Sequence, residues 1–87
     1  MRYAVKQDAV VWQQVDDEVV YLDLATSEYQ SVNASGAALW AEMAAPVARE
    51  RLAAVLVERF AVDQATADTD VDRFLDDLRA RGLLVAE

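Results

Sequence analysis

The hydrophobic pattern of this chain changes its period once, near Asn33. Before that residue, apolar and polar positions alternate with a period of two, which is typical of strands with one buried face. Three such segments follow one another across very short connections, and short connections join antiparallel neighbours. The pattern therefore predicts a three-stranded antiparallel meander, with strands at Ala9–Val15, Glu18–Leu24 and Glu28–Val32.

After Asn33 the apolar residues recur every three or four positions, as on one face of a helix. Asn33 and Asp63 can act as N-caps, because their side chains accept hydrogen bonds from free helical N–H groups. Gly82 is suited to terminate the last helix. The predicted helices span about Ala34–Ala44, Val47–Arg59 and Gln64–Arg81.

A sheet with one apolar face needs a cover, and three amphipathic helices supply it. We therefore expect a single α+β domain over residues 1–87, an N-terminal three-stranded meander followed by three helices. The arrangement is winged-helix-like, with the sheet moved to the N-terminus. The pattern leaves open whether residues 1–8 add a further strand.

The residue types present argue against catalysis. The chain has no cysteine and no histidine, so we expect no metal site, no cofactor and no nucleophilic triad. With Gly36 and Gly82 as the only glycines, a phosphate-binding glycine loop is also excluded. Asp76 and Asp77 are neighbours on a helix and point about 100° apart, so they are poorly placed to act on one substrate. We expect a protein that is not an enzyme.

The net charge of −8 limits the classes of partner that the chain is expected to bind. Nucleic acids and anionic membranes favour basic surfaces, so neither is an expected partner. A winged-helix DNA-binding domain is a weak rival, because its third helix carries five acidic residues between Asp68 and Asp77 against one basic residue, Arg73. No secretory or membrane-spanning segment is evident, which favours a cytoplasmic location. The acidity suits a basic or neutral peptide, or serves solubility alone.

Several runs in this order resemble the PqqD-like family, the RiPP recognition elements. They are Val-Tyr-Leu-Asp-Leu at residues 20–24, Glu-Tyr-Gln-Ser-Val-Asn at 28–33, Ala-Ser-Gly-Ala-Ala-Leu-Trp at 34–40, and the stretch 70–84 with its Phe-Leu and Gly-Leu-Leu pairs. The resemblance covers about residues 9–85. Val32 and Ser35 depart conservatively from the usual Leu and Thr.

The stand-alone size and acidity are most similar to leader-binding proteins of lasso-peptide biosynthesis. The resemblance implies that the domain holds the leader of a ribosomally made precursor peptide. It would present that leader to a separate cysteine protease, the leader peptidase, and to an ATP-dependent cyclase. The family also includes carriers of the precursor of the redox cofactor PQQ, which act with a radical enzyme, and this remains the alternative.

In this family the peptide site lies between the third strand and the third helix. If the segment 18–24 is the central strand, then the segment 28–32 is a free edge that can pair with an added strand. On the helix, Val71 and Leu75 would form the floor of a groove, and the aspartates would line its rim and bind basic leader residues. We expect an aromatic leader side chain, from a Tyr-x-x-Pro motif, to enter this groove. The candidate residues are Glu28, Tyr29, Gln30, Ser31, Val32, Asp68, Val71, Asp72, Leu75, Asp76 and Arg79.

Two alternatives to this site follow from the residues alone. Val71 and Leu75 can be plain core, and the aspartates can form a solvated face. An open strand edge can also pair with a second copy of itself, so we expect either a monomer or a weak homodimer.

Overall fold

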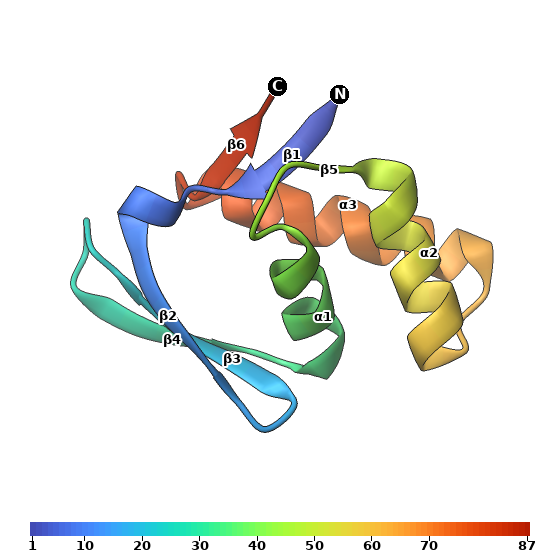
Figure 1. Cartoon of the computed structure of the whole chain (residues 1–87), viewed down its shortest axis with the longest axis horizontal. Coiled ribbons are helices and arrows are strands. Elements are labelled where there is room, and N and C mark those ends of the chain that lie inside the picture. The colour runs from blue at the N-terminus through green and yellow to red at the C-terminus, as the bar shows by residue number, and fades with distance from the viewer.

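The computed structural model describes all residues from 1 to 87 and places three helices against two small sheets (Figure 1). The elements, in chain order, are β1 (Arg2–Val5), a 3-10 turn (Gln7–Ala9), β2 (Val10–Val15), β3 (Glu18–Asp23), β4 (Glu28–Val32), α1 (Ala34–Glu42), β5 (Val47–Ala48), α2 (Arg49–Phe60), α3 (Gln64–Ala80) and β6 (Leu84–Ala86). The predicted α+β class, with a meander followed by helices, is confirmed.

The meander has the strand order β2-β3-β4, with both pairings antiparallel. In the central strand β3, Val19, Tyr21 and Asp23 are buried on the inner face, whereas Val20 and Leu22 lie half-buried on the outer face. This is the alternation that the sequence predicts. Asp16, in the turn between β2 and β3, has a φ of 54°, a left-handed conformation that Asp tolerates better than most residues.

A second sheet answers the question that the sequence leaves open at the N-terminus. Its order is β5-β1-β6, and β1 pairs antiparallel with both neighbours. Beyond the paired strands, Arg2 N donates to Glu87 O over 2.7 Å and Glu87 N donates to Arg2 O over 2.9 Å. The two ends of the chain therefore lie side by side.

The predicted caps are present. Asn33 Oδ1 accepts from Gly36 N over 3.1 Å, and Asp63 Oδ1 accepts from Thr66 N over 2.7 Å. The latter hydrogen bond lowers the pKa of Asp63. Gly82 follows α3 with a φ of 73°, a conformation that glycine adopts without strain.

Both ends of α2 differ from the predicted ones. α2 begins at Arg49 rather than Val47, because Val47 and Ala48 pair with β1. At its other end α2 extends to Phe60, one residue beyond the predicted Arg59, and Phe60 is 36% exposed. It is the last residue of the helix, since Ala61 turns into a left-handed conformation with a φ of 54°.

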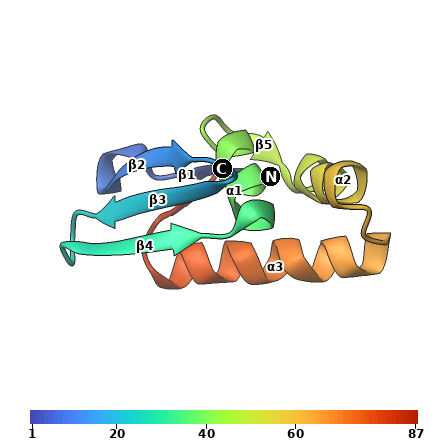
Figure 2. The same ribbon diagram turned by 90° about the horizontal axis from the view of Figure 1, so that it is seen from below.

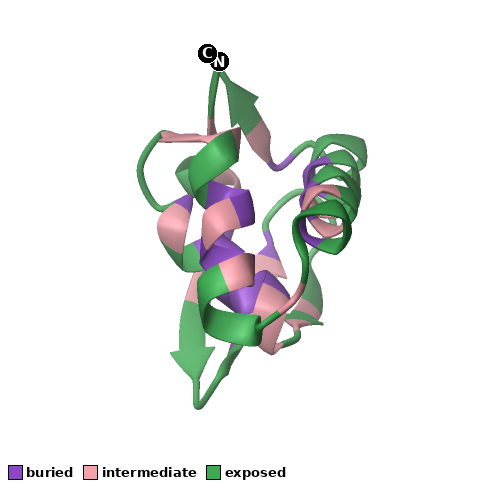
Figure 3. Cartoon of the chain, turned by 90° about the vertical axis from the view of Figure 1, so that its right-hand side faces the viewer, coloured by how far each residue is buried: buried purple, intermediate pink, exposed green.

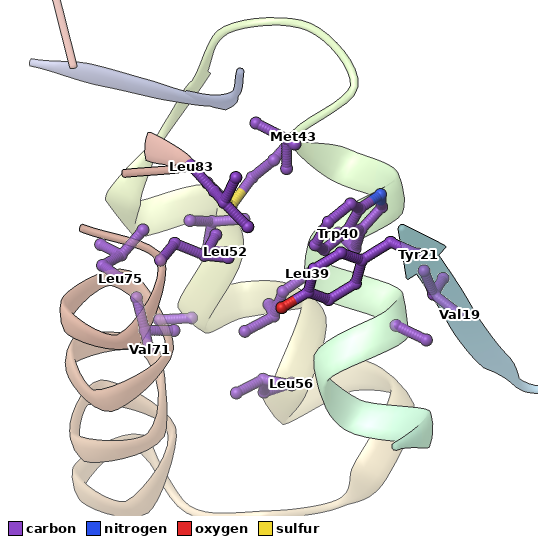
Figure 4. Packing of buried hydrophobic residues seen from close by; sticks show 14 of the residues in the cluster. Val19, Tyr21, Leu39, Trp40, Met43, Leu52, Leu56, Val71, Leu75 and Leu83 are labelled. Carbon is purple, nitrogen blue, oxygen red and sulfur yellow. The ribbon is translucent and has the colours of Figure 1, made fainter. Parts of the chain in front are cut away.

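The core lies between the inner face of the meander and the three helices (Figures 3 and 4). Trp40 is fully buried at its centre, and its ring stacks on Tyr21 with 4.8 Å between centroids. Trp12 meets Trp40 edge-on at 6.0 Å. This aromatic group fixes the meander to α1 and thereby sets the position of β4 beside the helices.

Candidate functional site

The strand β4 is a free edge of the meander, because it pairs with β3 alone. In Figure 2 it points opposite to the chain direction of α3, and the groove described below lies beside its C-terminal end. Glu28, Tyr29 and Ser31 are exposed, and Gln30 and Val32 are half-buried. An edge of this kind leaves every second backbone N–H and C=O group without a partner in the sheet.

A groove of about 330 Å³ opens at the C-terminal end of β4. It is bordered by the β4–α1 junction on one side and by α3 on the other. Its lining residues are Val32, Asn33, Ser35, Gly36, Leu39, Leu56, Asp70, Arg73 and Phe74. The lining combines an aliphatic and aromatic interior with charged side chains of both signs, as in sites that bind peptides.

Gly36 allows the walls of this groove to come together. A Cβ atom at that position would overlap Val32 Cγ1 and lie 3.4 Å from Phe74 Cε1. The contact distances show that the start of α1, the end of β4 and the middle of α3 converge here. The glycine therefore serves the close approach of three elements rather than an unusual backbone angle.

Val71 and Leu75, predicted to form the floor of this groove, belong to the core instead. Val71 is 0% exposed and Leu75 is 4% exposed, and both pack inside the helical layer (Figure 4). Neither residue is among those that line the groove, and both hold α3 against the core.

Asp68 and Asp72, predicted to line the rim of the groove, are bound by α2. Arg49 Nη2 lies 2.6 Å from Asp72 Oδ1, and Arg49 Nη1 lies 3.4 Å from Asp68 Oδ1. The hydrogen bond to Asp72 is the main reason why the pKa of Arg49 is raised. These two carboxylates are therefore already paired within the domain.

Asp76 and Arg79 complete the predicted stripe and do not line the groove either. They pair with each other over 3.1 Å on the exposed surface of α3. Their spacing is that of a helical surface ion pair, which contributes little to stability.

The side of α3 that does border the groove carries Asp70, Arg73 and Phe74. Asp72 lies two positions from both Asp70 and Phe74, which is about 200° around the helix. The sequence contained a signal for this side, because residues 70, 73, 74, 77 and 81 also recur at three- and four-residue intervals. Phe74 also continues the apolar spacing of the core residues Val71 and Leu78, so spacing alone does not separate the two sides.

Farther along the same side of α3, toward its C-terminus, the surroundings become polar. Arg81 Nε donates to Asp77 Oδ2 over 3.1 Å. Burial raises the pKa of Tyr21 on β3, and the carboxylates of Asp77 and Asp23 raise it further. The guanidinium of Arg81 partly offsets this increase in the pKa. The α3 side therefore changes from apolar near Phe74 to polar near Arg81.

Comparison with known proteins agrees with this geometry. The family model for coenzyme PQQ synthesis protein D (PqqD) matches residues 18–84. The chain belongs to the PqqD family. The matched region of this PqqD-family domain contains the whole of β3, β4 and the three helices, and so both walls of the groove.

One solved structure is also similar over nearly its whole length. It is described as TbiB1 in complex with the TbiA(beta) leader peptide, and it shares 31% identity with this PqqD-family chain. The match has a TM-score of 0.84 and covers 97% of this chain and 99% of that one. None of the curated protein sequences is a match for the chain.

No three carboxylates are close enough together to hold a metal ion. None of the three helices combines the length and the apolar character needed to cross a membrane.

Proposed function

We propose that this PqqD-family domain binds the leader of a ribosomally made precursor peptide. An extended leader segment adds to β4 as a fourth strand and inserts a side chain into the groove between β4 and α3. The open edge of β4 beside that groove is the observation that carries the proposal.

The similar solved structure supports the class of ligand, because it is a complex with a leader peptide. At 31% identity and with almost complete coverage of both chains, the two domains share their whole architecture. A peptide that pairs with a strand edge depends mainly on the backbone of that edge, so the binding mode tolerates many side-chain differences.

The expected strength of binding follows from the size of the site. A five-residue edge gives about three or four new backbone hydrogen bonds, each contributing roughly 0.5–1.5 kcal/mol. Association entropy offsets much of that gain. Burial of one or two large apolar side chains adds about 1.5–3 kcal/mol each. The dissociation constant is then expected between micromolar and nanomolar.

The groove also defines which leader side chain is preferred. Val32, Leu39, Leu56 and Phe74 offer an apolar interior, which favours a leader aromatic or large aliphatic residue. Arg73 and Asp70 lie at its border with opposite charges, so polar neighbours of that residue can be bound on either side. Our proposed contact set is therefore β4 together with Asp70, Arg73 and Phe74.

The bound leader is presented to separate enzymes, a cysteine leader peptidase and an ATP-dependent cyclase, and the domain itself performs no chemistry. The family description also favours a second candidate, a carrier of the precursor peptide of coenzyme PQQ. Both functions use the same edge and differ in the peptide that is bound.

Calorimetric titration of the purified domain with synthetic leader peptides tests the proposal. We expect a lasso-type leader to bind with a dissociation constant below about 10 μM, a range consistent with the interactions above. A scrambled peptide is the control, and tight binding of a PQQ precursor peptide alone would favour the second candidate. Absence of binding by either leader at about 100 μM, roughly 5.5 kcal/mol of affinity, would refute both.

Backbone methylation tests strand addition specifically. Every second leader N–H should face β4, so N-methylation at alternate positions should abolish binding, while methylation at the intervening positions should not. If methylation at every position is equally tolerated, the leader is not bound as a strand.

A further inference from the structure

The hydroxyl of Tyr21 is a polar group on a buried side chain, and it has no hydrogen-bond partner. Tyr21 is 3% exposed, and its ring is fixed by stacking on Trp40. None of the side-chain hydrogen bonds of the domain includes its oxygen. Trp40 Nε1 is the only unpartnered polar side-chain atom that is closed off from solvent, so Tyr21 Oη keeps contact with solvent. A hydroxyl in this state is free to bind a ligand.

Arg81 and Asp77, from the end of α3, lie beside this hydroxyl. The Tyr21 oxygen points away from β3 toward the helical layer (Figure 4). The Arg81 guanidinium approaches it closely enough to influence the pKa of Tyr21, but the two groups do not reach the geometry of a full hydrogen bond. Asp77 Oδ2 accepts from Arg81 Nε over 3.1 Å. We call Tyr21, Asp77 and Arg81 the polar cluster.

The polar cluster lies one strand repeat away from the apolar groove. Gln30, the β4 partner of Tyr21, precedes the groove residue Val32 by two positions, which is about 6.8 Å along a strand. On α3, which points the opposite way in Figure 2, Asp77 and Arg81 follow Phe74 by about 4.5 and 10.5 Å along the helix axis. A leader side chain two positions from the one in the groove would therefore lie level with the polar cluster.

Both kinds of hydrogen-bonding group are free in the polar cluster. The Nη groups of Arg81 are donors, Asp77 Oδ1 is an acceptor, and none of these atoms makes a hydrogen bond within the domain. The Tyr21 hydroxyl can act as either. A carboxamide side chain matches this set, because its oxygen accepts from the hydroxyl or the guanidinium while its NH2 group donates to the carboxylate.

A charged leader side chain matches the cluster less well. Asp77 and Asp23 already balance the charge of Arg81, and both raise its pKa. A leader carboxylate would add a negative charge without a compensating base, and it would leave Asp77 Oδ1 without a donor. A leader ammonium would meet the guanidinium at short range, and it could not accept from the Tyr21 hydroxyl.

We propose that the polar cluster is a second subsite for the leader, which binds an asparagine or glutamine side chain two positions away from the leader residue in the apolar groove. This inference rests on the proposed function. The groove supplies most of the affinity, and the polar cluster fixes the register. A slip by one residue would turn the carboxamide to the other face of the leader strand, and a slip by two would place it in the apolar groove.

The discrimination comes from the polar groups that the leader covers. An apolar leader side chain at this position would displace water from the Tyr21 hydroxyl and the Arg81 guanidinium without replacing the lost hydrogen bonds. A carboxamide restores them. The subsite should therefore distinguish leaders that fill the apolar groove equally well.

Guest substitutions in the leader test this preference by calorimetry. The probe is the synthetic leader that binds most tightly in the titration described above. Its groove residue is the one whose replacement by Ala no longer lowers affinity when the domain carries Phe74→Ala. Gln, Ala, Glu and Lys are then placed in turn two residues before and two residues after it. At one of these positions, we expect Gln to bind about threefold to tenfold more tightly than the other three.

Removal of the hydroxyl tests Tyr21 itself. Tyr21→Phe keeps the ring that stacks on Trp40, and it should reduce the preference for Gln over Ala to less than about twofold. Arg81→Met should do the same, and it serves if the Phe variant is poorly folded. Tyr3→Phe, the same loss of a hydroxyl on β1, is the control and should keep the full preference. A hydroxyl with only a structural role would change the affinity of the Gln and Ala peptides equally.

Three results would overturn the subsite and leave leader binding intact. They are equal binding of the Gln and Ala peptides at both positions, tighter binding of the Glu or Lys peptide, and a preference for Gln that survives in Tyr21→Phe and Arg81→Met. Failure of every leader to bind in the first titration would instead refute the proposed function, and this inference with it.

Discussion

The two sides of α3 contain similar residues and face very different surroundings. Toward α2, Asp68 and Asp72 are both bound by Arg49. Toward β4, Asp70 and Arg73 border an open groove, and neither takes part in an ion pair. A series of carboxylates at helical spacing therefore does not identify a binding side. A single arginine on a neighbouring helix decides which carboxylates stay available for a ligand.

Between these two sides lies the buried stripe, and its disruption should have the largest effect. Leu75→Arg would place a charge at a position that is 4% exposed. An unpaired buried charge costs about 3–5 kcal/mol, much of the stability of a domain this small. We expect cooperative thermal unfolding, followed by circular dichroism, to be lost. Asp76→Arg introduces the same side chain at an exposed neighbour and should melt near the wild type. If the Leu75 variant melts like the wild type, then the side of α3 that carries Leu75 does not face the core.

The groove side should control peptide affinity. Phe74→Ala removes the aromatic wall beside Val32 and Gly36, so leader affinity should fall about tenfold to a hundredfold, the equivalent of roughly 1.5–3 kcal/mol. Asp72→Asn, on the opposite side, should leave leader affinity unchanged. Calorimetric titration of both variants measures the difference. If Asp72→Asn weakens binding more than Phe74→Ala, then the leader contacts the side that faces α2.

The smallest effect is expected from the ion pairs between α2 and α3. Arg49→Met keeps the aliphatic part of the side chain and removes both pairings. Since the Asp72 side chain is 61% exposed, the loss should be no more than about 1 kcal/mol. Urea unfolding should show this difference at low salt and a smaller one at high salt, because salt screens exposed charges. An equal difference at both salt concentrations would assign the effect to packing instead.

Local signals in the sequence were sufficient to predict the three helices and the meander. Asn33 and Asp63 each place a side-chain oxygen at a helix start, and Gly82 occurs where the last helix ends, so these boundaries depend on neighbouring residues only. The alternation in residues 18–23 likewise depends on one strand and its two faces.

The second sheet had no local signal. β1 has four residues and β5 has two. The two partners of β1, β5 and β6, lie about 45 and 80 positions away from it along the chain. A short strand has too few positions for a period to be recognised, and pairing over such distances is a property of the whole fold.

The lining of the groove could not be predicted from the sequence, because α3 carries apolar residues on more than one side. Val71, Phe74 and Leu75 cover an arc of the helix that contains both core and groove positions. Helical spacing cannot tell which apolar residue faces a gap, because that depends on where β4 and Gly36 lie. The edge strand itself, by contrast, follows from the order of three strands joined by two short connections.

The β1–β6 pairing has a consequence for synthesis. Residues 2–5 are made before their partners at residues 84–86. β1 therefore keeps an unpaired edge while the residues between the two segments are being translated, and the second sheet can close only when residues 84–86 have emerged from the ribosome.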